Sequence, residues 1–350
     1  METHTRSNRQ VARWLFIGVF MIIIQVLIGG ITRLTESGLS ITEWKPITGA
    51  LPPLNDADWQ IEFDKYRTTD QFKYVHSNFN LSDFKFIFFW EWIHRVWARL
   101  LGLVFLGGFI YFLIRRKLTK KMIAPLVLLF LLGALQGLIG WVMVESGLVP
   151  EKFYVGHIEL TTHLIAALIL LAYTLWFALK LYYQGYEKVY NVQLRNLLLC
   201  TLVLFFIQLV YGGFMAGLKA AQTAPTWPDI NGYFLPPGMK EGSGWLDSIV
   251  NNKITIHFIH RGIAYLLFGL ITWFYFASKN YKANVLFNKS RVTLMILTIA
   301  QVILGILTVM NATSSNALIL FGVLHQFTAM LIVINFVYLL YLLGRKTAAT

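Results

Sequence analysis

Four histidines recur at matched places inside the long apolar stretches of this 350-residue chain, where polar side chains are costly and usually functional. They are His94, His163, His260 and His325. An imidazole at such a depth is either a hydrogen-bonded helix contact or a ligand for a transition metal. Structural zinc typically takes four ligands that include thiolates, and Cys200 is the only cysteine here. The four histidines therefore indicate a different kind of metal chemistry.

The elements that carry these histidines are membrane-spanning helices. Hydrophobic residues make up 57% of the chain and charged residues 13%, and mean hydropathy is +0.59, which excludes an ordinary soluble or disordered protein. Apolar stretches of about 20 residues, enough to cross a hydrocarbon core, occur eight times. They run approximately over Trp14–Thr32, Phe86–Ile114, Met122–Val144, Gly156–Lys180, Leu197–Leu218, Ile254–Ala277, Val292–Met310 and Ala317–Leu343.

Basic residues indicate the orientation of these spans. With the N-terminus inside, the cytoplasmic segments hold 17 basic and two acidic residues, whereas the outer segments hold more acidic than basic residues. The positive-inside rule then places both termini in the cytoplasm. This topology accounts for the net charge of +13 without a nucleic-acid partner. We expect a multi-pass protein of a bacterial cytoplasmic (inner) membrane, surrounded by lipid and compatible with an oligomer.

An internal repeat relates the two halves of the chain. Odd-numbered spans carry Gln-x-x-x-Gly and even-numbered spans carry a histidine at a matched place, in matched order. The Gln and Gly residues are Gln25 and Gly29, Gln136 and Gly140, Gln208 and Gly212, and Gln301 and Gly305. Each half has an even number of spans, so both halves enter the membrane from the same side. We predict an all-α integral membrane protein with two four-helix bundles, residues 1–180 and 181–350, related by a pseudo-two-fold axis along the membrane normal.

The four histidines lie at similar depth. Counted from the outer ends of the spans at 1.5 Å per residue, each is about 10–16 Å deep. Pairing within each half joins His94 with His163 and His260 with His325. Two neutral imidazoles on facing helices, with Gly-rich neighbours and aromatic bulk, suit axial ligation of haem iron. The glycines allow either close helix packing or the close approach of a flat ligand.

The halves differ one helical turn before the first histidine of each pair. Glu91 stands three residues before His94, whereas His257 stands three residues before His260. A carboxyl at this place is either a buried ion-pair partner for Arg95 or a group that handles protons.

Arginines accompany both of these helices. Arg95 and Arg99 share a face with Glu91, and Arg261 follows His260. Guanidinium groups inside a membrane require polar partners, and haem propionates are suitable ones.

These motifs resemble the haem A synthase family, in the cysteine-poor branch shared by bacteria and mitochondria. The resemblance is carried by the stretches Gly29–Pro46, Glu91-Trp-Ile-His94-Arg95, Gln136–Leu148, Thr226-Trp-Pro228, His260-Arg261 and His325-Gln326. Some bacterial members carry a cysteine pair in an outer loop, and this chain has none there.

The resemblance implies an oxidoreductase that converts a methyl group of haem O to a formyl group, giving haem A for cytochrome oxidase. Substrate haem O would lie between His94 and His163, with Arg95 as a further contact and Glu91 as a proton acceptor. A resident haem b would be ligated by His260 and His325. Further site candidates are Arg99, Arg261 and His257. The implied partner is haem O synthase, a protohaem farnesyltransferase, and the electron acceptor is not identified.

Two other functions fit paired membrane histidines. A di-haem electron-transfer protein, such as a quinol oxidoreductase similar to cytochrome b, would place its haems at different depths, whereas both pairs here share one depth. A haem transporter or chaperone would use the pairs as stages of transfer. Pigment extraction separates these alternatives, because the enzyme yields haem O or its oxidised products with haem B and a relay yields haem B alone.

Overall fold

The computed structural model describes residues 2–43, 48–239, 244–282 and 284–344. Within these ranges, eight helices are long and apolar enough to cross a membrane, which confirms the all-α multi-pass prediction. They are α1 (Glu2–Leu34), α4 (Leu81–Ile114), α5 (Lys120–Glu145), α6 (His157–Tyr182), α7 (Val192–Gly217), α10 (Lys253–Ala277), α11 (Val285–Met310) and α12 (Ser315–Leu342). Arg345 and Lys346, which contribute to the predicted orientation of the C-terminus, lie outside the described residues.

Several helices extend beyond their apolar stretches because polar caps start them earlier. α4 begins at Leu81 rather than Phe86, and α7 begins at Val192 rather than Leu197. An asparagine side chain accepts a hydrogen bond from a first-turn amide at the N-termini of α4, α7, α10 and α11; these residues are Asn80, Asn191, Asn252 and Asn284. Such a cap typically stabilises a helix by about 1 kcal/mol. Hydropathy therefore marks only the apolar part of each helix.

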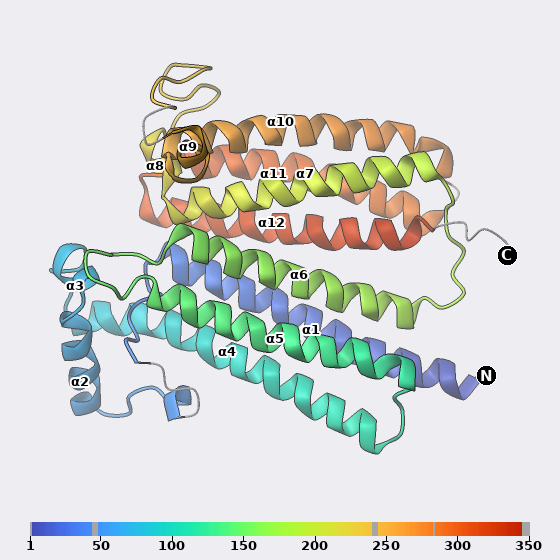
Figure 1. The fold of residues 1–350 in the computed structure, drawn as a ribbon, viewed down its shortest axis with the longest axis horizontal. Helices are drawn as coiled ribbons and strands as arrows, with labels where there is room; N and C mark the ends of the chain where they lie inside the picture. Colours follow the sequence, from blue (N-terminus) through green and yellow to red (C-terminus); the bar gives the residue numbers. More distant parts are fainter. Residues whose placement is uncertain (1, 44–47, 240–243, 283, 345–350) are drawn as a thin grey trace. The chain divides into compact units, whose positions relative to one another are not determined.

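The described chain contains two compact units (Figure 1). Residues 18–167 form what we term the N-terminal unit, and residues 1–17 with 168–350 form the C-terminal unit. In the C-terminal unit, α7 contacts α10, α10 contacts α11, α11 contacts α12, and α12 contacts α7, so the four helices close a ring. In the N-terminal unit, the Trp97 Nε1 of α4 donates to the Met21 carbonyl of α1 at 2.9 Å. α4 also contacts α5.

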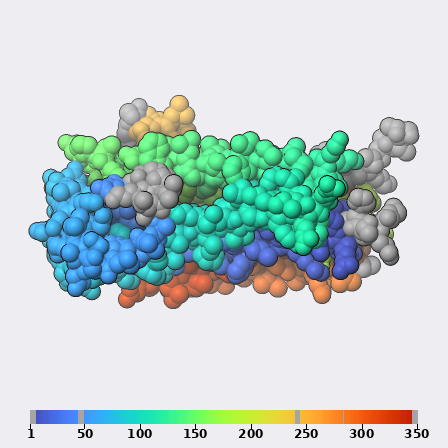
Figure 2. Space-filling model, turned by 90° about the horizontal axis from the view of Figure 1, so that it is seen from below, coloured from blue at the N-terminus to red at the C-terminus, as the bar shows by residue number. Residues whose placement is uncertain are grey.

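Each unit carries a helical outer segment between spanning helices. In the N-terminal unit it holds η1 (Thr48–Ala50), α2 (Asp56–Arg67) and α3 (Asp70–Tyr74). Figure 2 shows this segment, in blue, at one end of α4 and α5. Phe63 and Tyr66 of α2 pack against Phe84, Ile87 and Phe88 in the first turns of α4. In the C-terminal unit, α8 (Ala220–Thr223) and α9 (Trp245–Asn251) lie between α7 and α10, and η2 (Lys279–Tyr281) follows α10.

Candidate functional site

Each membrane histidine contacts the glutamine of the preceding spanning helix. Gln25 Nε2 on α1 lies 3.1 Å from both ring nitrogens of His94 on α4. Gln136 Nε2 on α5 lies 3.2 Å from His163 Nδ1 on α6. The C-terminal unit repeats the contact on α7 and α10 and on α11 and α12, with Gln208 Nε2 at 3.3 Å from His260 Nε2 and Gln301 Nε2 at 3.1 Å from His325 Nε2. The two repeated sequence motifs therefore meet in space at all four places.

The glycine four residues after each glutamine leaves room for the same imidazole. A Cβ atom at Gly29 would lie 3.0 Å from His94 Cε1, and one at Gly140 would lie 2.7 Å from His163 Cε1. In the C-terminal unit, the corresponding distance is 3.5 Å for Gly212 and His260 and 3.0 Å for Gly305 and His325. Each of these glycines thus faces a histidine ring. Leaving space for that ring is a third role, in addition to the close helix packing and the approach of a flat ligand that the sequence left open.

The histidines of each unit lie near one another, and the polar atoms around them are incompletely satisfied. His94 and His163 are close enough to interact electrostatically, as are His260 and His325. All four residues are only half-buried. The Oε1 atoms of the four glutamines are buried and accept no hydrogen bond from the described residues. Because buried polar groups are normally paired, these four acceptors mark the places beside the imidazoles where hydrogen bonding within the described residues is incomplete.

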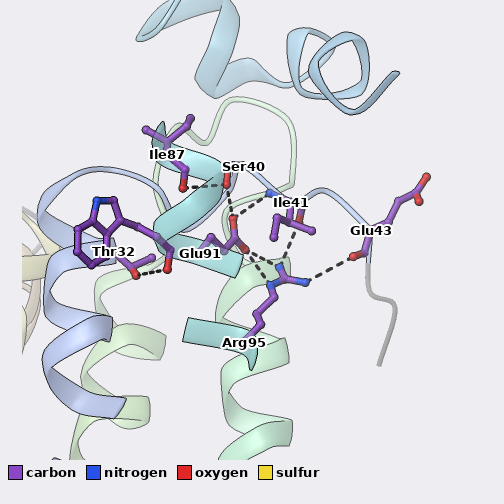
Figure 3. Close-up of polar contacts among 8 residues, drawn as sticks. Thr32, Ser40, Ile41, Glu43, Ile87, Glu91 and Arg95 are labelled. Carbon is purple, nitrogen blue, oxygen red and sulfur yellow. Dashed lines mark hydrogen bonds and ion pairs between the residues drawn. The ribbon is translucent and has the colours of Figure 1, made fainter. Parts of the chain in front are cut away.

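Glu91 is buried and held on both carboxylate oxygens (Figure 3). The Ser40 hydroxyl and the Ile41 amide each donate to Oε2 at 2.8 Å. Arg95 donates to Oε1 from Nε at 3.1 Å and from Nη2 at 2.5 Å. The same Nη2 also donates to the Ile41 carbonyl at 3.1 Å, and Nη1 lies 3.5 Å from the Glu43 carbonyl. Glu91 and Arg95 form an ion pair within α4, and their hydrogen bonds with Ser40, Ile41 and Glu43 hold the outer segment against this helix.

We term the arginine, its partner one turn earlier and their contacts with the outer segment a clamp. The C-terminal unit has a corresponding clamp, with His257 in place of the carboxylate. Arg261 Nε donates to His257 Nε2 at 3.0 Å. Its Nη atoms donate to the carbonyls of Asp229, at 2.6 Å from Nη1, and of Thr226, a short contact from Nη2. Because His257 accepts at Nε2, the neutral ring carries its proton on Nδ1, which is buried and has no partner among the described residues.

The arginines were predicted as partners of a haem, and the structure gives two of them other partners as well. Arg95 and Arg261 both reach main-chain carbonyls of their outer segments. Arg99 lies one turn beyond Arg95 on α4 and is half-buried. Ser40 and Ile41 did not emerge from the sequence as site residues, and their only signal there is a place in the stretch Gly29–Pro46. The last part of that stretch, residues 44–46, lies outside the described residues.

Gly140 and Gly212 provide a matched test of the glycine contacts. An alanine Cβ at position 140 would lie 2.7 Å from the His163 ring, so the ring or the helix has to shift, whereas 3.5 Å at position 212 is ordinary contact. Alanine in a helix interior is favoured over glycine by roughly 1 kcal/mol. We expect Gly212→Ala to leave the thermal unfolding midpoint in detergent unchanged or raised. Gly140→Ala should lower it by about 3 °C or more; equal midpoints would contradict the contact.

Comparison with known proteins places the chain in a family. The family model described as cytochrome oxidase assembly protein matches residues 12–337. A protein named Heme A synthase from Flavobacterium psychrophilum is 39% identical over 340 residues, which cover 96% of this chain and 98% of the relative. One of the same name from Novosphingobium aromaticivorans is 41% identical over 344 residues, covering 96% and 95%. The chain therefore belongs to the haem A synthase family of cytochrome oxidase assembly proteins.

Proposed function

We propose that the chain is an oxidoreductase that converts the methyl group of haem O to the formyl group of haem A. The observation that carries this proposal is the presence, in each unit, of one pair of half-buried membrane histidines held by glutamine and glycine. The relatives named Heme A synthase support it over nearly their full lengths. The Glu91 clamp distinguishes the N-terminal pair from the C-terminal pair, as a division between substrate and resident cofactor requires.

The residues at both pairs fit a haem. Neutral imidazoles are suitable axial ligands for haem iron, and each unit holds two of them close enough to interact. We assign His94 and His163, within residues 1–180, to substrate haem O. We assign His260 and His325, within residues 181–350, to a resident haem b, which supplies electron-transfer chemistry when bound. The repeated contacts support a pseudo-two-fold relation between two four-helix bundles.

Histidine variants test this division of labour. Replacing His260 or His325 with alanine removes a ligand of the resident haem, so we expect purified protein to lose its low-spin b-type spectrum. Replacing His94 or His163 should leave much of that spectrum and abolish haem A formation. The measurements are the reduced-minus-oxidised spectrum and chromatography of extracted haems. Equal loss of the resident spectrum from all four variants would overturn the assignment.

Glu91 is the proposed proton acceptor, because oxidation of a methyl group releases protons and this carboxylate lies one turn from His94. Both of its oxygens are engaged by donors, so the clamp orients the carboxylate and also ties the outer segment to α4. Arg95 serves mainly to position Glu91, with Arg99 as a further candidate for contact with the substrate. In the resident-haem half, His257 and Arg261 form a clamp that has no carboxylate.

Glu91→Gln and Ser40→Ala separate these two roles. Glu91→Gln removes the titratable group and places an amide N–H beside the groups that donate to Glu91. Ser40→Ala removes one of those donors and keeps the carboxylate. Loss of a general base typically costs about 100-fold or more in rate. We expect that loss of haem A formation in Glu91→Gln, with the resident haem retained, and near-normal activity in Ser40→Ala. Equal losses would make Glu91 a positioning residue, and wild-type activity of Glu91→Gln would exclude it as the acceptor.

The finer assignments of location and partner follow from the same function. Haem O would be supplied by haem O synthase, a protohaem farnesyltransferase, and released electrons pass to an acceptor that no motif identifies. We place the chain in a bacterial inner membrane among lipids, with both termini cytoplasmic.

Reporter fusions test the proposed orientation. Lys117 lies between α4 and α5, on the strongly basic side, whereas Asp64 lies in α2 of the outer segment. A periplasm-active phosphatase fused after Asp64 should be active and one fused after Lys117 inactive, and a cytoplasm-active reporter should give the reverse pattern. Activity of the phosphatase at Lys117 would contradict the orientation.

A further inference from the structure

We propose that the four glutamines of the repeat are positioning residues that fix the plane of each haem-ligating imidazole. They are Gln25, Gln136, Gln208 and Gln301. The inference rests on the proposed function, because it concerns histidines assigned there as ligands. It adds residues on the odd-numbered spans to a site whose ligands all lie on the even-numbered spans.

Each imidazole is restrained at two points by a single neighbouring helix. An imidazole turns about its Cβ–Cγ bond, and in this site the glutamine amide meets its nitrogens while the glycine backbone meets Cε1. For His94 the two points are Gln25 Nε2 at 3.1 Å and Gly29, where an added Cβ would be 3.0 Å from Cε1. Four residues separate the two points, so they share a helix face. Rotation of the ring would break one contact or collide at the other.

The N-terminal unit shows which end of the glutamine amide faces the histidine. Gln25 Nε2 also donates to the His94 carbonyl at 3.1 Å, and Gln136 Nε2 donates to the His163 carbonyl at 2.9 Å. A carbonyl can only accept, so the amide nitrogen must lie at this position in both cases. Gln25 Nε2 is equidistant from the two nitrogens of the His94 ring and is therefore not aligned with either lone pair. Its contact is compatible with a metal at Nε2.

Gln301 contacts both nitrogens of its histidine. His325 Nδ1 lies 3.1 Å from the Gln301 main-chain carbonyl, which can only accept, so Nδ1 carries the proton. Nε2 then has the free lone pair, and the Gln301 side-chain nitrogen lies 3.1 Å from it. This is the tautomer that a metal at Nε2 requires. The carbonyl would hold Nδ1–H whether or not Nε2 carried a metal, because the two nitrogens are separate atoms of the ring.

Gln301→Leu tests the proposal in the purified full-length protein with its resident haem. Leucine has similar volume but no side-chain amide, so it removes the contact at Nε2 and keeps the main-chain carbonyl at Nδ1. The largest g value of a low-spin bis-histidine haem depends on the angle between its imidazole planes. We expect this electron paramagnetic resonance signal to shift or broaden, and transfer of haem to apomyoglobin to become at least tenfold faster. Gln208→Leu, which acts on the other ligand, should have the same effects.

Two controls isolate the contact. Gln136→Leu makes the same change in the N-terminal unit and should leave the resident-haem signal unchanged. Thr308→Val changes a polar residue on α11 whose hydroxyl donates to its own helix, at the Leu304 carbonyl, and should also leave the signal unchanged. An unaltered signal and transfer rate in both Gln301→Leu and Gln208→Leu would overturn the inference, as would an equal effect of Thr308→Val. Absence of a low-spin haem from the wild-type protein would instead refute the proposed function.

Discussion

A neutral imidazole inside a membrane span needs a polar neighbour, and the remainder of this site depends on how that neighbour is supplied. The partner in all four cases is a glutamine on the preceding spanning helix. A glutamine reaches the ring only if the two helices approach closely, which the glycine one turn later permits. The two residues of the repeated Gln-x-x-x-Gly motif therefore act together: the glutamine supplies a polar contact to the ring and the glycine supplies the space.

The same constraint determines where the rings are accessible. The glutamine and the glycine meet one side of each histidine, and the residue remains half-buried rather than enclosed. The second histidine of the unit lies near enough to interact with it. The helix packing that brings glutamine to each histidine thus also leaves part of each imidazole uncovered, as the proposed ligation requires.

The spans and the histidine pairs could be predicted from the sequence because lipid demands long apolar stretches and the repeat makes the histidines stand out. The contacts of Gln25 with His94 could not, since the rotation of one helix against another determines which side chain reaches the ring. The Ile41 amide on Glu91 leaves no trace in the sequence, because any residue offers the same main-chain donor. The early start of α4 reflects the Asn80 cap, which hydropathy does not register.

Because the arginines bind main-chain carbonyls, two outer segments of different sequence can be held against the corresponding helices α4 and α10. Arg95 donates to the Ile41 carbonyl and Arg261 to the Asp229 carbonyl, and a carbonyl is present whatever the side chain. The outer segments can therefore diverge in sequence while the arginine clamp persists. The residue one turn before each arginine is more restricted in type, because its side chain must accept a hydrogen bond from the arginine Nε. Glutamate and histidine both satisfy that requirement. The choice between them adds a carboxylate to one half only, and the proposed division of roles between the two halves rests on that single difference.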